Sequence, residues 1–249
     1  MNRLGSLTLV LAAATLAACS DSSGPASSGP QASFQLATKP ATAGPGMAAL
    51  VGQEVLVAGT DTIVVNSVQM VLREIELNRV GGSACDTTLA EDSCEEFELN
   101  SQLFDLPLGS GAQRAITVAI DTGTYDRIEL KIHKPESSDD AGFLALHPEF
   151  DGVSIKMTGT YNGTPFTYIS DLDVEQEHDF IPPLVVDANN NLGVTMFVDL
   201  QGWFLNQAGD GFLDPASANN GGQNEGEVKS NIEASIDAFE DHDRDGVED

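Results

Sequence analysis

The stretch VSIKMTGTYNGTPFTYIS, residues 153–170, decides the fold class because apolar and polar residues alternate on both sides of a tight turn. Asn162-Gly163 at its centre is typical of the two-residue turn that joins antiparallel strands. With that turn, Gly159 faces Phe166 across the hairpin, and its missing side chain leaves room for the ring. Residues 153–170 therefore predict a β-hairpin with one apolar face.

The second strand of this hairpin is expected at an exposed edge, because Pro165 has no N–H to donate. The same period of two recurs in ITVAI (116–120), DRIELKI (126–132) and VTMFVDL (194–200). Turn-forming Gly, Pro, Asn and Asp residues separate these stretches. The pattern predicts an all-β domain over residues 48–226, an immunoglobulin-like or related antiparallel β-sandwich.

The region after the sandwich, residues 227–249, has a different period. Val228, Ile232, Ile236 and Phe239 form one stripe of a short C-terminal helix. The same residues also partly alternate, so a final strand is an alternative.

The N-terminus has the layout of a secretory signal, with a basic start and a short apolar run over residues 1–18. That run is shorter than the roughly 20 apolar residues of a membrane-spanning helix. Leu16-Ala17-Ala18-Cys19 resembles the lipobox of bacterial lipoproteins, which implies that Cys19 carries a lipid and becomes the mature N-terminus. Ser20 at the next position favours the outer membrane or cell surface.

Residues 19–47 are rich in Ser, Gly, Pro, Ala and Thr and contain few large apolar residues. Such a composition is typical of a flexible tether. The sequence thus predicts a folded domain that is held away from a membrane by a lipid-anchored linker.

Two cysteines remain, Cys85 and Cys94, close together in a polar stretch. An exported chain lies in an oxidising compartment, so we expect a disulfide between them. No histidine lies near either cysteine, which disfavours zinc.

The net charge of −28 excludes general affinity for nucleic acid phosphates, which need clustered Lys and Arg. It also disfavours electrostatic docking to anionic lipid, so the expected membrane contact is through the lipid anchor only. A surface this acidic attracts cations. The sequence does not identify a protein or glycan partner.

Three stretches resemble a β-sandwich domain of unknown function found in bacterial envelope lipoproteins. They are SVQMVLREIELNRV (67–80), FELNSQLFDLPLGS (97–110) and ITVAIDTGTYDRIELKI (116–132). The resemblance covers about residues 55 to 135. It implies a fold and a location but no activity.

The C-terminal residues DHDRDGVED resemble the first part of EF-hand and thrombospondin-type calcium loops. Calcium takes six to eight oxygen ligands, and this spacing directs alternate carboxylates inward. The expected ligands are Asp241, Asp243, Asp245, Asp249 and the carbonyl of Val247, with Gly246 at the sharp turn. The bidentate Glu of the twelfth position is missing, which predicts weak binding in the range of about 10⁻⁴–10⁻³ M. The alternative is a solvated acidic tail.

Other motifs suggest alternative functions. Asp121 in AIDTGT resembles an aspartic-protease strand end, although Asp121-Thr122-Gly123 also suits a hairpin turn between two strands. Trp203 and Phe204 form either an exposed platform for a carbohydrate ligand or the closed end of a core. The acidic run SDLDVEQEHDF (170–180) is expected to be a solvated strand face.

The four histidines, His133, His147, His178 and His242, show no metal-binding spacing, and we expect them on the surface or in loops.

The sequence as a whole predicts a lipid-anchored protein of the bacterial cell envelope. It would be a non-enzymatic binding or structural module stabilised by calcium. A carboxylate-dependent hydrolase or a carbohydrate-binding surface protein is the alternative.

Overall fold

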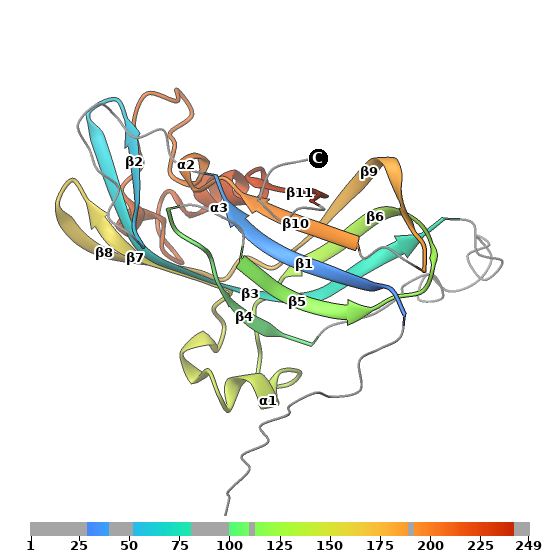
Figure 1. Ribbon diagram of the computed structural model, residues 1–249. Helices are drawn as coiled ribbons and strands as arrows, with labels where there is room; N and C mark the ends of the chain where they lie inside the picture. The colour runs from blue at the N-terminus through green and yellow to red at the C-terminus, as the bar shows by residue number, and fades with distance from the viewer. Residues whose placement is uncertain (1–28, 40–51, 81–99, 110–112, 189–191, 242–249) are drawn as a thin grey trace, which may run out of the picture.

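The computed structural model describes residues 29–39, 52–80, 100–109, 113–188 and 192–241, in which two β-sheets pack against each other (Figure 1). The smaller sheet has the strand order β11 (Ile236–Glu240), β10 (Leu192–Val198), β1 (Gln31–Thr38) and β5 (Gln113–Ala119). The larger sheet has the order β8 (Thr164–Ser170), β7 (Ile155–Tyr161), β3 (Asp61–Arg79), β6 (Gly123–Ile132) and β9 (Val174–Val186). Two further strands, β2 (Glu54–Ala58) and β4 (Gln102–Asp105), pair with β3. The predicted all-β sandwich is confirmed.

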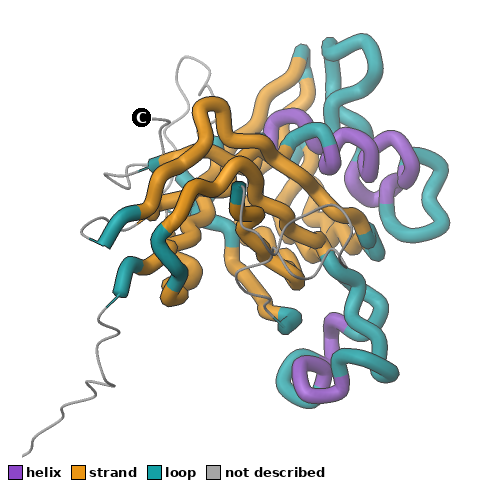
Figure 2. The backbone as a smooth tube through the Cα atoms, turned by 90° about the vertical axis from the view of Figure 1, so that its right-hand side faces the viewer, coloured by secondary structure: helices purple, strands orange, loops and turns teal. Residues whose placement is uncertain are grey.

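The helices are short and lie outside the sheets. They are α1 (Ala141–Leu144), α2 (Leu200–Trp203), α3 (Glu225–Glu233) and the 3₁₀ turns η2 (Pro148–Phe150) and η3 (Pro215–Ala218). Figure 2 shows them in two groups, with α2 and α3 near one end of the sandwich and α1 on a separate lobe below it. Within the described residues, no helix combines the length and the hydrophobicity needed to cross a membrane.

The core lies between the two sheets. The smaller sheet contributes Phe34, Leu36 and Val194, and the larger sheet contributes Ile128 and Leu130, all of them buried. These residues occupy alternate positions of their strands, as a period of two requires when one face turns inward.

The hairpin expected around Asn162-Gly163 is formed by β7 and β8. Gly159 pairs with Phe166, as predicted, and both turn residues have positive φ, as the two-residue turn requires. A Cβ on Gly159 would lie 2.2 Å from Val64 O and 3.1 Å from the Phe166 ring, so only glycine fits. The strand that contains Pro165, β8, is an edge strand of the larger sheet, as predicted.

The prediction of a flexible tether over residues 19–47 is wrong for β1. Residues 31–38 form a central strand of the smaller sheet, between β5 and β10. Ala32, Phe34 and Leu36 alternate along this strand and are buried. Few large apolar residues suffice here because strands on both sides supply the backbone hydrogen bonds. Strand β1 also runs parallel to β10, whereas antiparallel pairing was expected.

The C-terminal stripe divides between two elements. Val228 and Ile232 are buried on helix α3, whereas Ile236 belongs to β11 and pairs with Val198 of β10. The predicted helix and the alternative final strand are therefore each correct for one half of the segment. Strand β11 consequently belongs to the smaller sheet of the sandwich.

Asp121-Thr122-Gly123 does not form the expected hairpin turn. Strand β5 before it lies in the smaller sheet and β6 after it lies in the larger sheet, so this segment passes between the sheets. The Tyr125 hydroxyl donates to Asp121 O at 2.9 Å, and Arg79 Nη2 donates to Thr122 O at 2.5 Å. The local sequence suits a turn, but core burial requires the two strands to lie in different sheets.

Candidate functional site

Strand β3 changes its partner at Val71. The Val71 carbonyl accepts from His133 N–H at 3.0 Å, just after β6, and its N–H donates to Ser154 O at 2.8 Å, just before β7. Between His133 and Ser154 the chain leaves the sheet. We call this segment, residues 134–154, the excursion; it contains α1 and η2. Gly152 N–H donates to Pro135 O at 2.9 Å across the base, and the buried Phe150 anchors the lobe.

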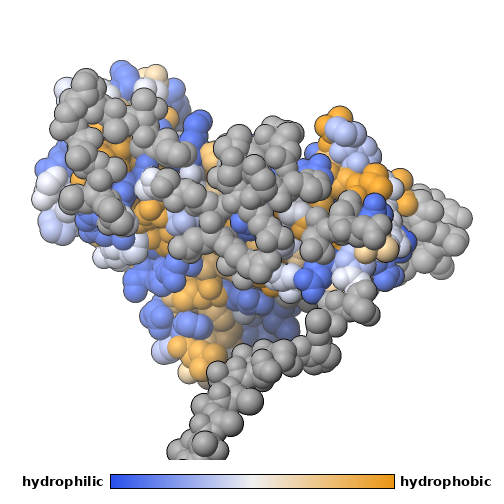
Figure 3. Space-filling model, viewed as in Figure 1, coloured by the Kyte–Doolittle hydropathy of each residue, from blue (hydrophilic) through white to orange (hydrophobic). Residues whose placement is uncertain are grey.

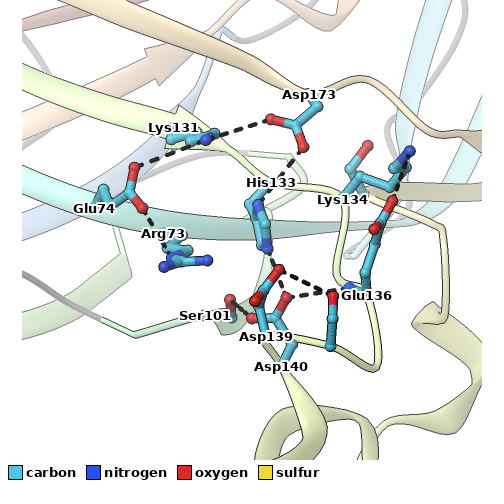
Figure 4. A network of polar contacts seen from close by, with 12 residues as sticks. Arg73, Glu74, Ser101, Lys131, His133, Lys134, Glu136, Asp139, Asp140 and Asp173 are labelled. Atoms are coloured by element: carbon cyan, nitrogen blue, oxygen red, sulfur yellow. Dashed lines mark hydrogen bonds and ion pairs between the residues drawn. The ribbon is translucent and has the colours of Figure 1, made fainter.

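His133 and Asp140 form a buried pair at the base of this excursion (Figure 4). His133 Nε2 lies 2.8 Å from Asp140 Oδ2, which also accepts the Glu136 N–H at 3.1 Å. The Ser101 hydroxyl donates to the other oxygen, Oδ1. Burial acts to raise the pKa of Asp140, but the hydrogen bonds from Ser101, His133 and Glu136 outweigh it and hold the pKa below its ordinary value. The carboxylate is thus ionised and closes the loop that begins the excursion.

The second ring nitrogen of His133 faces Asp173. His133 Nδ1 lies 3.7 Å from Asp173 Oδ2, too far for a hydrogen bond, and it has no hydrogen-bond partner among the described residues. Figure 4 shows the polar network continuing from Asp173 to Lys131 and Glu74, with Nζ–carboxylate distances of 3.7 and 3.8 Å. A buried imidazole thus lies between two carboxylates from different parts of the chain.

Ser101, His133 and Asp140 are the residue types of a hydrolytic triad, but their connectivity differs. In such a triad the histidine accepts the serine proton and the carboxylate orients the histidine. Here the Ser101 hydroxyl donates to Asp140 instead of to His133. This geometry does not activate the Ser101 hydroxyl as a nucleophile. The hydrogen bond from Ser101 to Asp140 instead holds the start of β4 against the excursion.

A cavity of about 670 Å³ adjoins this network, between β4 and α1. Its described lining consists of Asn100, Ser101, Gln102, Leu103, Asp105, Asp139, Asp140, Gly142, Phe143, Leu146 and His147. Leu146 is 77% exposed, and α1 buries none of its four residues. Figure 3 shows hydrophobic residues gathered on this lower lobe with hydrophilic residues beside them. We call this cavity the β4–α1 pocket.

Trp203 and Phe204 do not form an exposed platform. Both side chains are fully buried, and Trp203 Nε1 donates to Ser235 Oγ at 2.8 Å. The Asp199 side chain caps α2 by accepting the Gln201 N–H, and this short helix turns the two rings inward. A carbohydrate platform at these residues is therefore excluded.

A second cavity, of about 580 Å³, lies beside α2, α3 and β11. Lys39 and Asp199 in its lining form an ion pair at 3.1 Å. The third charged residue of the lining, Asp237, lies 3.5 Å from His178 Nδ1.

The acidic run of β9 is a strand face, as expected. Glu175 and Glu177 approach Glu129 of β6, with one carboxylate oxygen of each within 4.8 Å of the others. Arg127 lies 3.2 Å from both Glu129 and Glu177. Burial raises the pKa of Glu129 most, and the neighbouring Glu177 and Glu175 raise it further, against the effect of Arg127. The guanidinium of Arg127 thus already supplies a positive charge to this acidic triad.

Asp121 lies on the surface, with its side chain 77% exposed. A protease dyad places two aspartates together to share a proton. The charged partner of Asp121 is instead Arg79, whose Nη1 lies 3.9 Å from Oδ2.

Of the predicted calcium ligands, only Asp241 belongs to the described residues. It is fully buried, accepts a hydrogen bond from Thr195 Oγ1 at 2.6 Å, and donates its N–H to Gly193 O at 3.0 Å. This aspartate thus holds the end of β11 against β10. The other predicted ligands, Asp243, Asp245, Val247 and Asp249, lie outside the described residues, as do Cys19, Cys85 and Cys94.

The expectation that the histidines lie on the surface or in loops is wrong for His178, which lies in β9 with its side chain 14% exposed. His133 lies in the loop after β6, as that expectation allows, but it is buried. His147 lines the β4–α1 pocket, and His242 lies outside the described residues. Metal-ligand spacing does not detect the site of His133, because its hydrogen-bond partner is a single carboxylate, that of Asp140, which in turn accepts from Ser101. The local signal for this pair is a histidine directly after a strand, followed within seven residues by polar residues and two aspartates in HKPESSDD (133–140).

Comparison of the chain with protein-family models, with curated proteins and with solved structures gave no match. The arguments about function therefore rest on the residues of this chain.

Proposed function

We propose that this protein is a lipid-anchored component of the bacterial cell envelope and that it works as a non-enzymatic binding module. The observation that carries the binding role is the β4–α1 pocket, which lies beside the well-ordered His133–Asp140 network. The Ser101 hydroxyl in that network is committed to Asp140, which supports binding over hydrolysis. The lipobox ending at Cys19 supports the anchor.

The position of β1 makes the proposed anchor short. The first described strand begins at Gln31, so few residues separate it from Cys19. An extended chain spans at most about 3.5 Å per residue, which gives a reach of about 40 Å. As a flexible coil the same linker would average about 20 Å. The sandwich would therefore be displayed close to the membrane surface.

Two further features belong to this proposal. A disulfide between Cys85 and Cys94 would constrain the insertion between β3 and β4. Calcium bound by residues 241–249 would stabilise the end of β11, where Asp241 is already buried. Both would suit a protein that works outside the cytoplasm.

Metabolic labelling with a radioactive fatty acid in a bacterial host tests the anchor. We expect label on the wild-type chain and a membrane-associated protein after cell fractionation. The Cys19→Ala variant should carry no label and should leave the membrane fraction. A wild-type chain that remains unlabelled and soluble would refute the proposed anchor.

A further inference from the structure

We propose that the β4–α1 pocket binds an extended segment of a partner polypeptide in which an arginine or lysine stands next to an apolar residue. The inference names a ligand for the binding role proposed above and in that sense rests on it. It is carried by the charge of the pocket, by its apolar wall and by the edge of β4 that pairs with no other described strand.

The charge of the pocket favours a cation. The described lining contains three aspartates and no lysine or arginine. Asp140 is engaged by His133, but Asp105 and Asp139 are exposed and have no ion-pair partner in the described part of the chain. Within the described residues, these two carboxylates accept hydrogen bonds from neutral side chains, those of Gln69 and Ser138. A guanidinium or ammonium group would supply the missing positive charge.

The apolar wall favours a ligand that is more than a simple cation. Phe143 is half-buried on α1, which buries none of its residues, and Leu146 is largely exposed in the turn that follows this helix. An exposed leucine beside a half-buried aromatic ring gains by covering its surface with an apolar group, at about 25 cal/mol per Å². A basic residue next to an apolar residue matches both parts of the pocket.

The edge of β4 favours a polypeptide. Strand β4 pairs with β3 along one edge, and no strand of the described chain pairs with its other edge. Gln102, Leu103 and Asp105 of β4 line the pocket. An extended segment can add main-chain hydrogen bonds to such an edge while its side chains enter the adjoining pocket.

Fluorescence anisotropy on the full-length protein in a neutral detergent tests the proposal. The probe is a labelled peptide, Gly-Leu-Arg-Leu-Arg-Gly, and the matched probe replaces both arginines with citrulline, which has nearly the same shape without the charge. We expect saturable binding of the arginine peptide and loss of binding for the citrulline peptide. Asp105→Asn with Asp139→Asn should weaken binding about three- to tenfold, and Leu146→Ser should also weaken it.

The control variant is Glu175→Gln, which removes one charge from the acidic triad on β9. Because the protein is strongly acidic, a general attraction would be weakened by the same factor for each charge removed, whether from β9 or from the pocket, and that result would overturn the proposal. Equal binding of the citrulline peptide, or arginine amide binding as tightly as the peptide, would also overturn it. A protein that is not lipidated but binds the peptide would refute only the anchor, whereas a lipidated protein that binds no peptide would refute only this inference.

Discussion

The side chain of Asn219 takes the place of a neighbouring strand for Ile169 at the edge of β8. Asn219 Oδ1 accepts the Ile169 N–H at 2.7 Å, and Asn219 Nδ2 donates to Thr167 O at 3.3 Å. The next residue, Asn220, accepts the Asp171 N–H in the same way at 3.2 Å. Open strand edges are sites of aggregation, and two side chains from the η3 region cover this one.

Asn219→Ala should destabilise the protein by about 1 kcal/mol and should promote association through β8. Asn219→Asp retains the acceptor for Ile169 and loses the donor for Thr167, so it should have a smaller effect. Urea unfolding and sedimentation velocity at several concentrations measure the two effects. Asn66→Ala, which removes a surface amide bonded to Gln53, is the control. An Asn219→Ala protein that is as stable and monomeric as this control would contradict the assignment.

Trp203 is the only tryptophan of the chain, so its fluorescence reports on its burial directly. The folded protein should show blue-shifted emission that acrylamide quenches poorly, and both properties should reverse in urea. Trp203→Ala should cost about 3–5 kcal/mol because a large buried side chain is removed. Strong quenching of the folded protein would instead indicate an exposed ring.

Gly159→Ala should destabilise the β7–β8 hairpin more than Gly163→Ala. At Gly163 only the positive φ opposes a side chain, at a cost of about 1 kcal/mol, because the space around it is open. At Gly159 a Cβ would meet the Val64 carbonyl as well as the Phe166 ring. Thermal unfolding of both variants gives the comparison.

A second variant separates the two contacts of Gly159. Phe166→Leu relieves the ring contact only, so it should not restore the stability of Gly159→Ala, since the backbone of Val64 remains. Full recovery in the double variant would show that the ring alone excludes a side chain.

The stability that Asp140 provides should depend on pH. Its pKa is lowered in the folded protein, so its contribution is present above the unfolded value of about 3.9 and is lost as the pH falls through the lower folded value. The free energy of unfolding, measured in urea between pH 6 and pH 3, should therefore fall more for the wild type than for Asp140→Asn. Asp151→Asn, an exposed change in the same excursion, is the control and should follow the wild type. Identical slopes for wild type and Asp140→Asn would contradict the prediction.

Calcium should bind to the C-terminal residues with a Kd of about 10⁻⁴–10⁻³ M, measured by calorimetry on metal-stripped protein. Asp243→Ala should abolish binding without changing the stability of the metal-free protein. Asp241→Asn should lower that stability even without calcium, because Asp241 is buried against Thr195. Magnesium is the control ion. Flat calorimetric traces for the wild type would leave the segment as an acidic tail.

The features that the sequence predicted correctly depend on neighbouring residues. The Asn162-Gly163 turn fixes the register of β7 and β8, so Gly159 and Phe166 could be paired from spacing alone. The alternation of Ile128, Leu130 and Ile132 likewise identified β6 and its buried face.

The features that the sequence did not predict depend on distant residues. The composition of residues 19–47 predicts a linker because the flanks of β1 are rich in small and polar residues, and the partner of this strand, β10, lies far along the chain. The sequence does not predict the pocket because Asp105 and Asp139 are far apart in the chain. They come together only because residues 134–154 leave the sheet beside Val71, next to β4. The sequence around Trp203 is compatible with an exposed or a buried ring, because the hydrogen-bond partner that allows its burial, Ser235, lies in another segment.

The parallel pairing of β1 with β10 determines when the smaller sheet can form during synthesis of the chain. Residues 31–38 leave the ribosome well before their parallel partner at residues 192–198 and the adjoining β11. Contacts between segments so distant in sequence form slowly, because a long loop must close before they stabilise the chain. The smaller sheet therefore cannot close until β10 and β11 have been synthesised. For a chain exported as proposed here, late closure leaves time to cross the membrane before the sandwich forms.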